Sequence, residues 1–272
     1  MSVARQDHIS TTLINGKVLV AGGYNGAALD STELYDASSG TWTRTTAMNT
    51  ARTFHSATLL ENGNVLNLSG GDSEIGFLAT AALYDPTTDM WVITNPMNVI
   101  RVSHAASLLQ NGLVLVSAGY NKIYPTSSEL FNPLPQTWTF TSNVNIARQR
   151  HTSSILPNGN VLIAGGYNGS SLTSAEVYDQ STEIWTHTGS LNYARDGHRA
   201  IVLENGFVLV TGGSSSTNMA ELYNPETRNW IITRNMNATR AFHAISTLID
   251  RKILINGGIC NRNIYLNSAE LY

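Results

Sequence analysis

The chain has little charge, almost no cysteine and no long apolar run. Only 13% of its 272 residues are charged, and the formal net charge is −3. Binding to nucleic acid through phosphates needs a basic face, so nucleic acid is not an expected partner. No apolar stretch reaches the length of about 18 residues that a transmembrane helix requires, so no membrane partner is expected. Cys260 is the only cysteine, which excludes an internal disulfide.

The composition is otherwise rich in small polar residues. Asn, Thr and Ser number 27, 29 and 26, while 42% of the residues are apolar and can form a large core. The first eight residues lack the basic and then apolar layout of a signal peptide. With no disulfide either, this favours a cytoplasmic protein. These numbers indicate a globular protein and name no chemistry.

Three ladders of residues recur with one period. The tryptophans Trp42, Trp91, Trp138, Trp185 and Trp230 are 49, 47, 47 and 45 residues apart. Six histidines follow the same spacing, namely His8, His55, His104, His151, His198 and His243. Glycine pairs such as Gly22-Gly23 and Gly165-Gly166 form the third ladder. Three ladders with one period indicate repeated structural units.

Each unit predicts four short antiparallel strands. Ala-Arg-x-x-His precedes an apolar run, an Asn-Gly pair and a second apolar run that ends at the glycine pair. Asn-Gly between apolar runs predicts a type I′ hairpin with positive φ at both residues. Glu-Leu-Tyr and the Trp segment supply the third and fourth strands. No window has the period of a helix, so the fold class is all-β.

Four strands repeated every 47 residues are typical of a β-propeller blade. The Gly-Gly pair followed by Tyr and Trp at fixed distances resembles the kelch family. Among kelch proteins, the repeats are most similar to those of galactose-oxidase-like propellers. The resemblance covers the whole chain and implies one six-bladed kelch β-propeller domain. Its blades span about residues 1–48, 49–97, 98–144, 145–191, 192–236 and 237–272, and the last lacks its outer, Trp-bearing strand. We expect a closed six-bladed ring; the alternative is a piece of a longer protein.

Residues repeated in every blade are most simply explained by the fold. We expect the repeated Tyr or Phe and the Trp residues to pack between neighbouring blades. The arginines should pair with the glutamates of the Glu-Leu-Tyr strand, except in blade two, where Ala82 stands in place of glutamate. Six histidines spread around an axis are too far apart to bind one metal ion, so we expect backbone or acidic partners for them.

No motif for catalysis or for a cofactor is present. The isolated acids form no pattern, no Tyr-His dipeptide occurs, and Cys260 has no recognisable copper-site context. The likeness to galactose oxidase is therefore limited to the scaffold, and we expect no enzyme activity, no metal and no cofactor.

The resemblance to kelch adaptor domains implies that ligands bind on one face. Two sets of loop residues form this ligand-binding face. One set follows each glycine pair, and the other follows each repeated arginine. The first set is Tyr24, Asn25, Asp72, Ser73, Tyr120, Asn121, Tyr167, Asn168, Ser214, Ser215 and Ile259. The second set is Gln6, Asp7, Thr53, Phe54, Val102, Ser103, Gln149, Arg150, Asp196, Gly197, Ala241 and Phe242. From these we take as ligand-face candidates Tyr24, Asn25, Phe54, Asp72, Tyr120, Asn121, Arg150, Tyr167, Asn168, Asp196 and Phe242.

Two functions remain open. The absence of a catalytic motif and the variable loops favour a non-catalytic interaction scaffold that binds a protein or peptide. The alternative is a carbohydrate-binding protein or a galactose-oxidase-like enzyme on the same scaffold, since aromatic loop residues also stack on sugars. The strand at 267–272 should be an open edge, which could pair with a second copy of the chain.

Overall fold

The computed structural model describes residues 1–72, 76–213, 218–260 and 264–272. No described residue is helical, so none belongs to a helix that could cross a membrane. The chain forms two compact units, Met1–Thr141 and Ser142–Tyr272, which are described in turn. The expected all-β class is confirmed.

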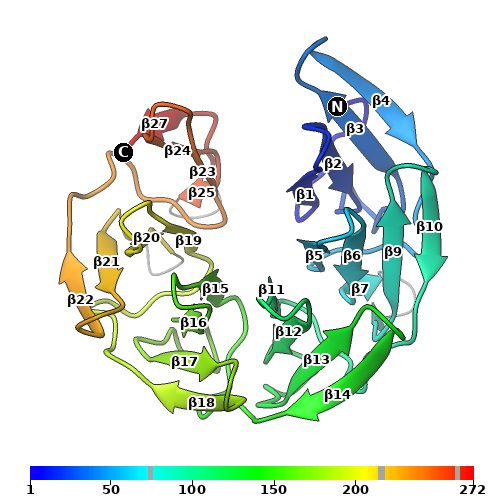
Figure 1. The fold of residues 1–272 in the computed structure, drawn as a ribbon. Helices are drawn as coiled ribbons and strands as arrows, with labels where there is room; N and C mark the ends of the chain where they lie inside the picture. The colour runs from blue at the N-terminus through cyan, green and yellow to red at the C-terminus, as the bar shows by residue number, and fades with distance from the viewer. Residues whose placement is uncertain (73–75, 214–217, 261–263) are drawn as a thin grey trace. The chain divides into compact units, whose positions relative to one another are not determined.

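The first unit contains three four-stranded antiparallel sheets, which are blades one to three (Figure 1). Blade one consists of β1 (Ile9–Thr12), β2 (Val18–Ala21), β3 (Thr32–Asp36) and β4 (Thr41–Thr45). Blade two consists of β5 (Ser56–Leu59), β6 (Val65–Leu68), β9 (Ala81–Asp85) and β10 (Met90–Ile93), with the small hairpin β7 (Gly71–Asp72) and β8 (Gly76–Phe77). Blade three consists of β11 (Ala105–Leu108), β12 (Val114–Ser117), β13 (Ser128–Asn132) and β14 (Thr137–Thr141).

The second unit contains two further four-stranded sheets and one of three strands. Blade four consists of β15 (Thr152–Ile155), β16 (Val161–Ala164), β17 (Ala175–Asp179) and β18 (Ile184–His187). Blade five consists of β19 (Arg199–Val202), β20 (Val208–Thr211), β21 (Ala220–Asn224) and β22 (Asn229–Ile232). Blade six consists of β23 (Ala244–Thr247), β24 (Ile253–Asn256) and β27 (Ala269–Leu271), with the small hairpin β25 (Ile259–Cys260) and β26 (Ile264–Tyr265).

Six blades, with three strands in the last, confirm the propeller prediction. In each of the first five blades the Trp-bearing strand forms one edge of the sheet, and the strand after the histidine forms the other. Successive first strands contact each other within a unit, as β1, β5 and β11 do in the first (Figure 1).

The Asn-Gly hairpins differ from the predicted turn type. In the β1–β2 turn Gly16 has φ of 81°, whereas Asn15 does not have positive φ. The Gly16 amide donates to the Leu13 carbonyl at 2.9 Å, and the Leu13 amide donates to the Lys17 carbonyl at 2.8 Å. This is a three-residue connection that ends in a left-handed glycine, so the type I′ prediction is wrong. The asparagine contributes its side chain, because Asn15 Oδ1 accepts from the Lys17 amide at 3.1 Å.

The core lies between neighbouring blades, as the aromatic ladder predicts. One cluster joins Leu19 and Met48 of blade one to Tyr84 and Trp91 of blade two, all of them buried. The Tyr84 and Trp91 rings lie 5.0 Å apart, and Trp91 Nε1 donates to the Thr46 carbonyl of the preceding blade at 3.0 Å. Trp138 and Trp230 likewise donate to carbonyls of the preceding blade, those of Asn95 and Gly189, so these aromatic pairs bind neighbouring blades together.

Five buried ion pairs tie the segment that precedes each blade to the third strand. The pairs, with nitrogen–oxygen distances of 2.6–3.0 Å, are Arg5–Glu33, Arg101–Glu129, Arg148–Glu176, Arg195–Glu221 and Arg240–Glu270. The predicted arginine–glutamate ladder is confirmed, including its gap in blade two. There Arg52 has no carboxylate partner among the described residues and donates instead to the carbonyls of Ser69 and Thr80, each at 2.9 Å.

Candidate functional site

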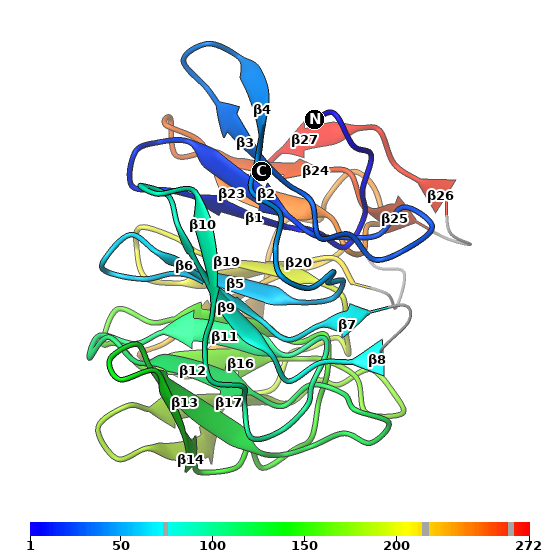
Figure 2. The same ribbon diagram turned by 90° about the vertical axis from the view of Figure 1, so that its right-hand side faces the viewer.

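The two predicted sets of loop residues are joined by short backbone bridges. The Gln6 amide donates to the Tyr24 carbonyl at 3.0 Å, and the Tyr24 amide donates back at 2.8 Å. Equivalent bridges join Thr53 to Gly71, Val102 to Tyr120, Gln149 to Tyr167 and Ala241 to Ile259. We call the residues after each repeated arginine and after each glycine pair the loop face. In the first unit it lies on the side of β7 and β8, away from the β1–β2 and β5–β6 turns (Figure 2).

One position of the loop face has left-handed backbone in every blade. The residue two places after each repeated arginine has φ of 52–62°, and these residues are Asp7, Phe54, Ser103, Arg150, Gly197 and Phe242. Such φ values are uncommon for bulky residues and cost free energy. Because the backbone conformation at this position recurs in all six blades, it belongs to the fold, and the residue type varies from blade to blade.

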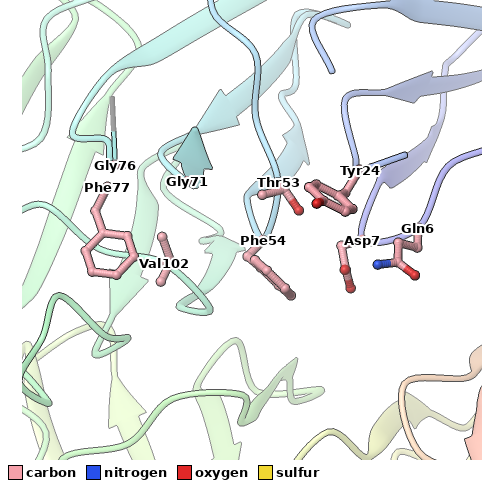
Figure 3. Close-up of a pocket in the computed structure, with 9 residues that line it drawn as sticks. All are labelled: Gln6, Asp7, Tyr24, Thr53, Phe54, Gly71, Gly76, Phe77 and Val102. Atoms are coloured by element: carbon pink, nitrogen blue, oxygen red, sulfur yellow. The ribbon is translucent and has the colours of Figure 1, made fainter. Parts of the chain in front are cut away.

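A pocket of about 340 Å³ opens on the loop face of the first unit. Figure 3 shows Phe54 in its middle, with Phe77 and Val102 on one side and Tyr24, Asp7 and Gln6 on the other. Thr53, Gly71 and Gly76 complete the lining. Phe54 is 43% exposed and Phe77 is 36% exposed, so both rings remain accessible to a ligand. The structure thus places the predicted Tyr24 and Phe54 in one largely apolar pocket with a polar end.

Phe77 was not among the predicted ligand-face residues. It lies in β8, and the short pairing of β7 with β8 brings it back beside Gly71. Its ring contacts the predicted Tyr120 edge-on at 5.8 Å, and Tyr120 in turn lies 5.3 Å from the Tyr124 ring. Blade six has the same short hairpin, in which Tyr265 pairs with Ile259 as Phe77 pairs with Gly71. The signal in the sequence was therefore an aromatic residue six positions after Gly71 in blade two and six positions after Ile259 in blade six.

A second cluster lies on the loop face of the second unit. The Arg150 guanidinium lies 5.5 Å from the centre of the Phe242 ring and 3.8 Å from a carboxylate oxygen of Asp196. Gly197 makes this possible, since a Cβ there would approach the Phe242 ring to 2.7 Å. Asp196 is buried and accepts from the Ser171 hydroxyl at 2.8 Å. Three predicted residues are thereby brought together, with the arginine still partly exposed.

The remaining predicted residues shape the loops around these two places. Asn121 Nδ2 donates to the Ile100 carbonyl at 3.0 Å and so holds its loop against the segment before Arg101. The amides of Asn25 and Asn168 close tight turns onto Ala27 and Ser170. Tyr167 bridges to Gln149 and Ser171. Asp72 belongs to β7, while Ser73, Ser214 and Ser215 lie outside the described residues.

The repeated histidines are buried between blades, apart from His8. Burial, with a smaller effect of the neighbouring arginines, lowers the pKa of His55, His104 and His243 to about 3. Three of these rings bond to hydroxyl groups of the preceding blade, in the pairs His104–Ser56, His198–Thr152 and His243–Thr211 at 2.7–2.9 Å. Backbone groups of Ala21 and Arg101 also act on His55 and His104, in the direction that raises their pKa, so the hydroxyls add to the expected backbone partners. The described residues contain no group of three or more His, Cys, Asp or Glu that could hold a metal ion.

Comparison with known proteins agrees with this architecture. The Kelch motif matches two segments, residues 8–49 and 150–192, which fall in blades one and four. No curated protein matches the chain. The closer likeness to galactose-oxidase-like propellers stays a prediction. The matched segments share their repeated Gly-Gly, Tyr and Trp residues with the other blades, which together with the six blades supports a kelch-repeat β-propeller.

Proposed function

We propose that this protein is a non-catalytic interaction module that binds a protein or peptide segment through its loop face. The kelch propeller is commonly a protein-interaction scaffold. The observation that carries the proposal is the pocket around Phe54, in which aromatic and aliphatic side chains converge at the mouth of otherwise polar loops. Its volume of about 340 Å³ suits one aromatic or branched aliphatic side chain of a partner.

The chemistry of the pocket supports an anchor residue surrounded by polar contacts. Binding energy at protein interfaces concentrates in a few desolvated aromatic contacts, with a polar rim that excludes water. Phe54 and Phe77 supply the apolar contact, and Gln6, Asp7 and Thr53 supply polar groups at its border. Because the chain carries so few charges, affinity should depend only weakly on salt.

The test selects peptides from a random displayed library on the wild-type protein and measures their affinity by fluorescence anisotropy. Phe54→Ala and Phe77→Ala should each weaken the selected peptides about tenfold or more. Phe140→Ala is the matched control, because Phe140 is 59% exposed on β14, outside the pocket lining. Failure to enrich any peptide, or equal binding by Phe54→Ala and Phe140→Ala, would overturn the proposal.

The alternative, recognition of a carbohydrate, draws on the same aromatic surface. A glycan array probed with wild type and Phe54→Ala separates the two. A glycan lost on Phe54→Ala, without any peptide ligand, would replace the peptide proposal with a lectin-like function. Peroxide production from galactose in the presence of Cu(II) would instead show an oxidase and contradict the non-catalytic reading.

A further inference from the structure

Five blades hold a carboxylate at the same buried place. In blade three, Glu129 Oε1 accepts from Arg101 Nη2 at 2.8 Å and from the Val99 amide at 3.1 Å. Glu129 Oε2 accepts from the amide and the side-chain nitrogen of Asn98, at 2.7 and 2.8 Å. Blades four and five repeat this arrangement around Glu176 and Glu221. In each of these blades, the arginine and the backbone amides form an anion-binding site, and the glutamate side chain supplies the anion.

Blade two keeps the donors of this site without the carboxylate. Arg52 is 1% exposed, as buried as its equivalents, but Ala82 occupies the strand position of the glutamate. Asn49 and Thr50 stand where Asn98 and Val99 stand in blade three. Their amides therefore lose the acceptor that the other blades provide. Arg52 is thus a buried charge without a counter-charge in the described part of the blade, an arrangement that destabilises the folded state.

A second acceptor of the arginine is lost in the same blade. In blades one, three, four and six a serine hydroxyl accepts from Arg Nη2 at 3.0–3.1 Å. Thr80 replaces this serine in blade two, and its Oγ1 is buried without a partner among the described residues. The Arg52 Nη2 group thus has neither of its usual acceptors, although Nη1 keeps its two backbone carbonyls.

The residue opposite Ala82 is also changed. Asn67 is the strand partner of Ala82. In the other blades the partner of the glutamate is aliphatic, namely Val20, Val116, Ile163, Val210 or Ile255. Asn67 is fully buried. Its Nδ2 donates to Met48 Sδ at 2.9 Å, and its Oδ1 has no partner in the described part of the chain. Sulfur is a weak acceptor, so this amide can redirect its N–H groups toward a better one. An added donor stands beside the missing carboxylate.

We propose that blade two binds a small monovalent anion, of the size of formate or chloride, where the other blades hold the glutamate carboxylate. Arg52 and the amides of Asn49 and Thr50 donate to it, and Asn67 adds a further donor. Charge-assisted hydrogen bonds of this kind are the strong ones. A water molecule could accept from the same donors but would leave the guanidinium charge uncompensated. Asn49 is exposed, as Asn98 is, and gives the anion a path from solvent.

The experiment compares thermal unfolding of the wild type in sodium gluconate, sodium formate and sodium chloride at constant ionic strength. Gluconate is too large for the site and serves as the reference anion. The wild-type Tm should rise with formate or chloride and saturate, by about 3–6 °C at high occupancy. The matched control is the double variant Ala82→Glu with Asn67→Val, which recreates the side chains of the other blades and fills the site. Its Tm should not respond to the exchange of anions.

Glu129→Ala provides a positive control, because it opens the equivalent place in blade three and should gain stabilisation by formate. A direct readout is the ³⁵Cl line width in solution, which the wild type should broaden, formate should restore, and the double variant should leave sharp. Equal Tm shifts in the wild type and the double variant would show a general salt effect and overturn the proposal. A wild type that responds to neither anion would overturn it as well.

Discussion

Blade two and blade three carry the same arginine in surroundings that differ in charge. Arg101 pairs with Glu129, whereas Arg52 has Ala82 at the glutamate position and donates to two backbone carbonyls. Burial lowers the pKa of Arg52 to about 10, with no carboxylate to oppose the effect; at Arg101 burial also lowers the pKa, but Glu129 acts to raise it. The comparison teaches that the position of the arginine is set by the blade backbone, and the carboxylate is a separable part.

The largest effect should come from acid, and it tests a feature that blades two and three share. His55 and His104 both have pKa values lowered to about 3 by burial, as does His243, against an ordinary value of 6.5. Between these values the unfolded chain binds more protons, so stability is full above pH 6.5 and falls as the pH drops toward 3. Each of the three histidines should cost about 2 kcal/mol by pH 5, and together they should cost about 6 kcal/mol.

Urea unfolding at several pH values checks this. His55→Gln and His104→Gln should each reduce the slope of stability against pH by about one proton, to the same extent in both blades. A free energy of unfolding that stays constant from pH 6.5 to 4 would show that the histidines protonate in the native state.

The next effect comes from making a complete blade resemble blade two. Glu176 and Arg148 are fully buried and 2.8 Å apart. Glu176→Ala leaves the buried Arg148 guanidinium without a counter-charge and should lower the free energy of unfolding by about 3–5 kcal/mol. The exposed pair of Glu204 and Arg251 offers the control, and Glu204→Ala should cost little. A loss below about 1 kcal/mol for Glu176→Ala would mean that the pair behaves as a surface pair.

The reverse change should make blade two resemble the others. Ala82→Glu combined with Asn67→Val supplies Arg52 with a carboxylate and restores the aliphatic residue opposite. We expect a gain of about 2 kcal/mol in chloride-free buffer, less than the loss at Glu176, because Arg52 already has two carbonyl acceptors. Chemical denaturation measures it. If the double variant is less stable than the wild type, blade two has repacked around Ala82 and no longer accepts a glutamate.

Much of the fold was predictable because each signal recurs. The strands, the packing of Tyr and Trp between blades and the arginine–glutamate pairs depend on residues that the chain repeats every 45–49 positions. Even the gap at Ala82 was visible as a departure from the ladder. The turn type was not predictable from Asn-Gly alone, since the asparagine uses its side chain rather than positive φ.

The site was less predictable because it depends on what does not recur. Tyr24 and Phe54 could be placed on the loop face by their offsets from repeated residues. Phe77 was not placed, because the β7–β8 pairing that positions it has its counterpart in β25–β26 of blade six and does not recur in every blade. The contact joins Arg150 of blade four to Phe242 of blade six and depends on the space that Gly197 leaves for the ring, which no sequence pattern indicates.

The smallest predicted effect on stability concerns the left-handed position that Phe54 occupies in blade two and Gly197 in blade five. Glycine adopts positive φ without the steric cost that other residues incur there. Phe54→Gly should therefore be about 1 kcal/mol more stable than Phe54→Ala, while both lose the ring and bind selected peptides equally poorly.

Arg251 supplies the control for that comparison. It has φ of 68° in the β23–β24 turn, where the other blades have glycine. Arg251→Gly should be more stable than Arg251→Ala by about the same amount as at Phe54. Both Arg251 variants should bind the selected peptides as the wild type does. Denaturation and anisotropy on the four variants decide the point. If Phe54→Gly retains peptide affinity, the ring is not the anchor contact, and the bulky residue at this strained position serves the fold instead of the ligand.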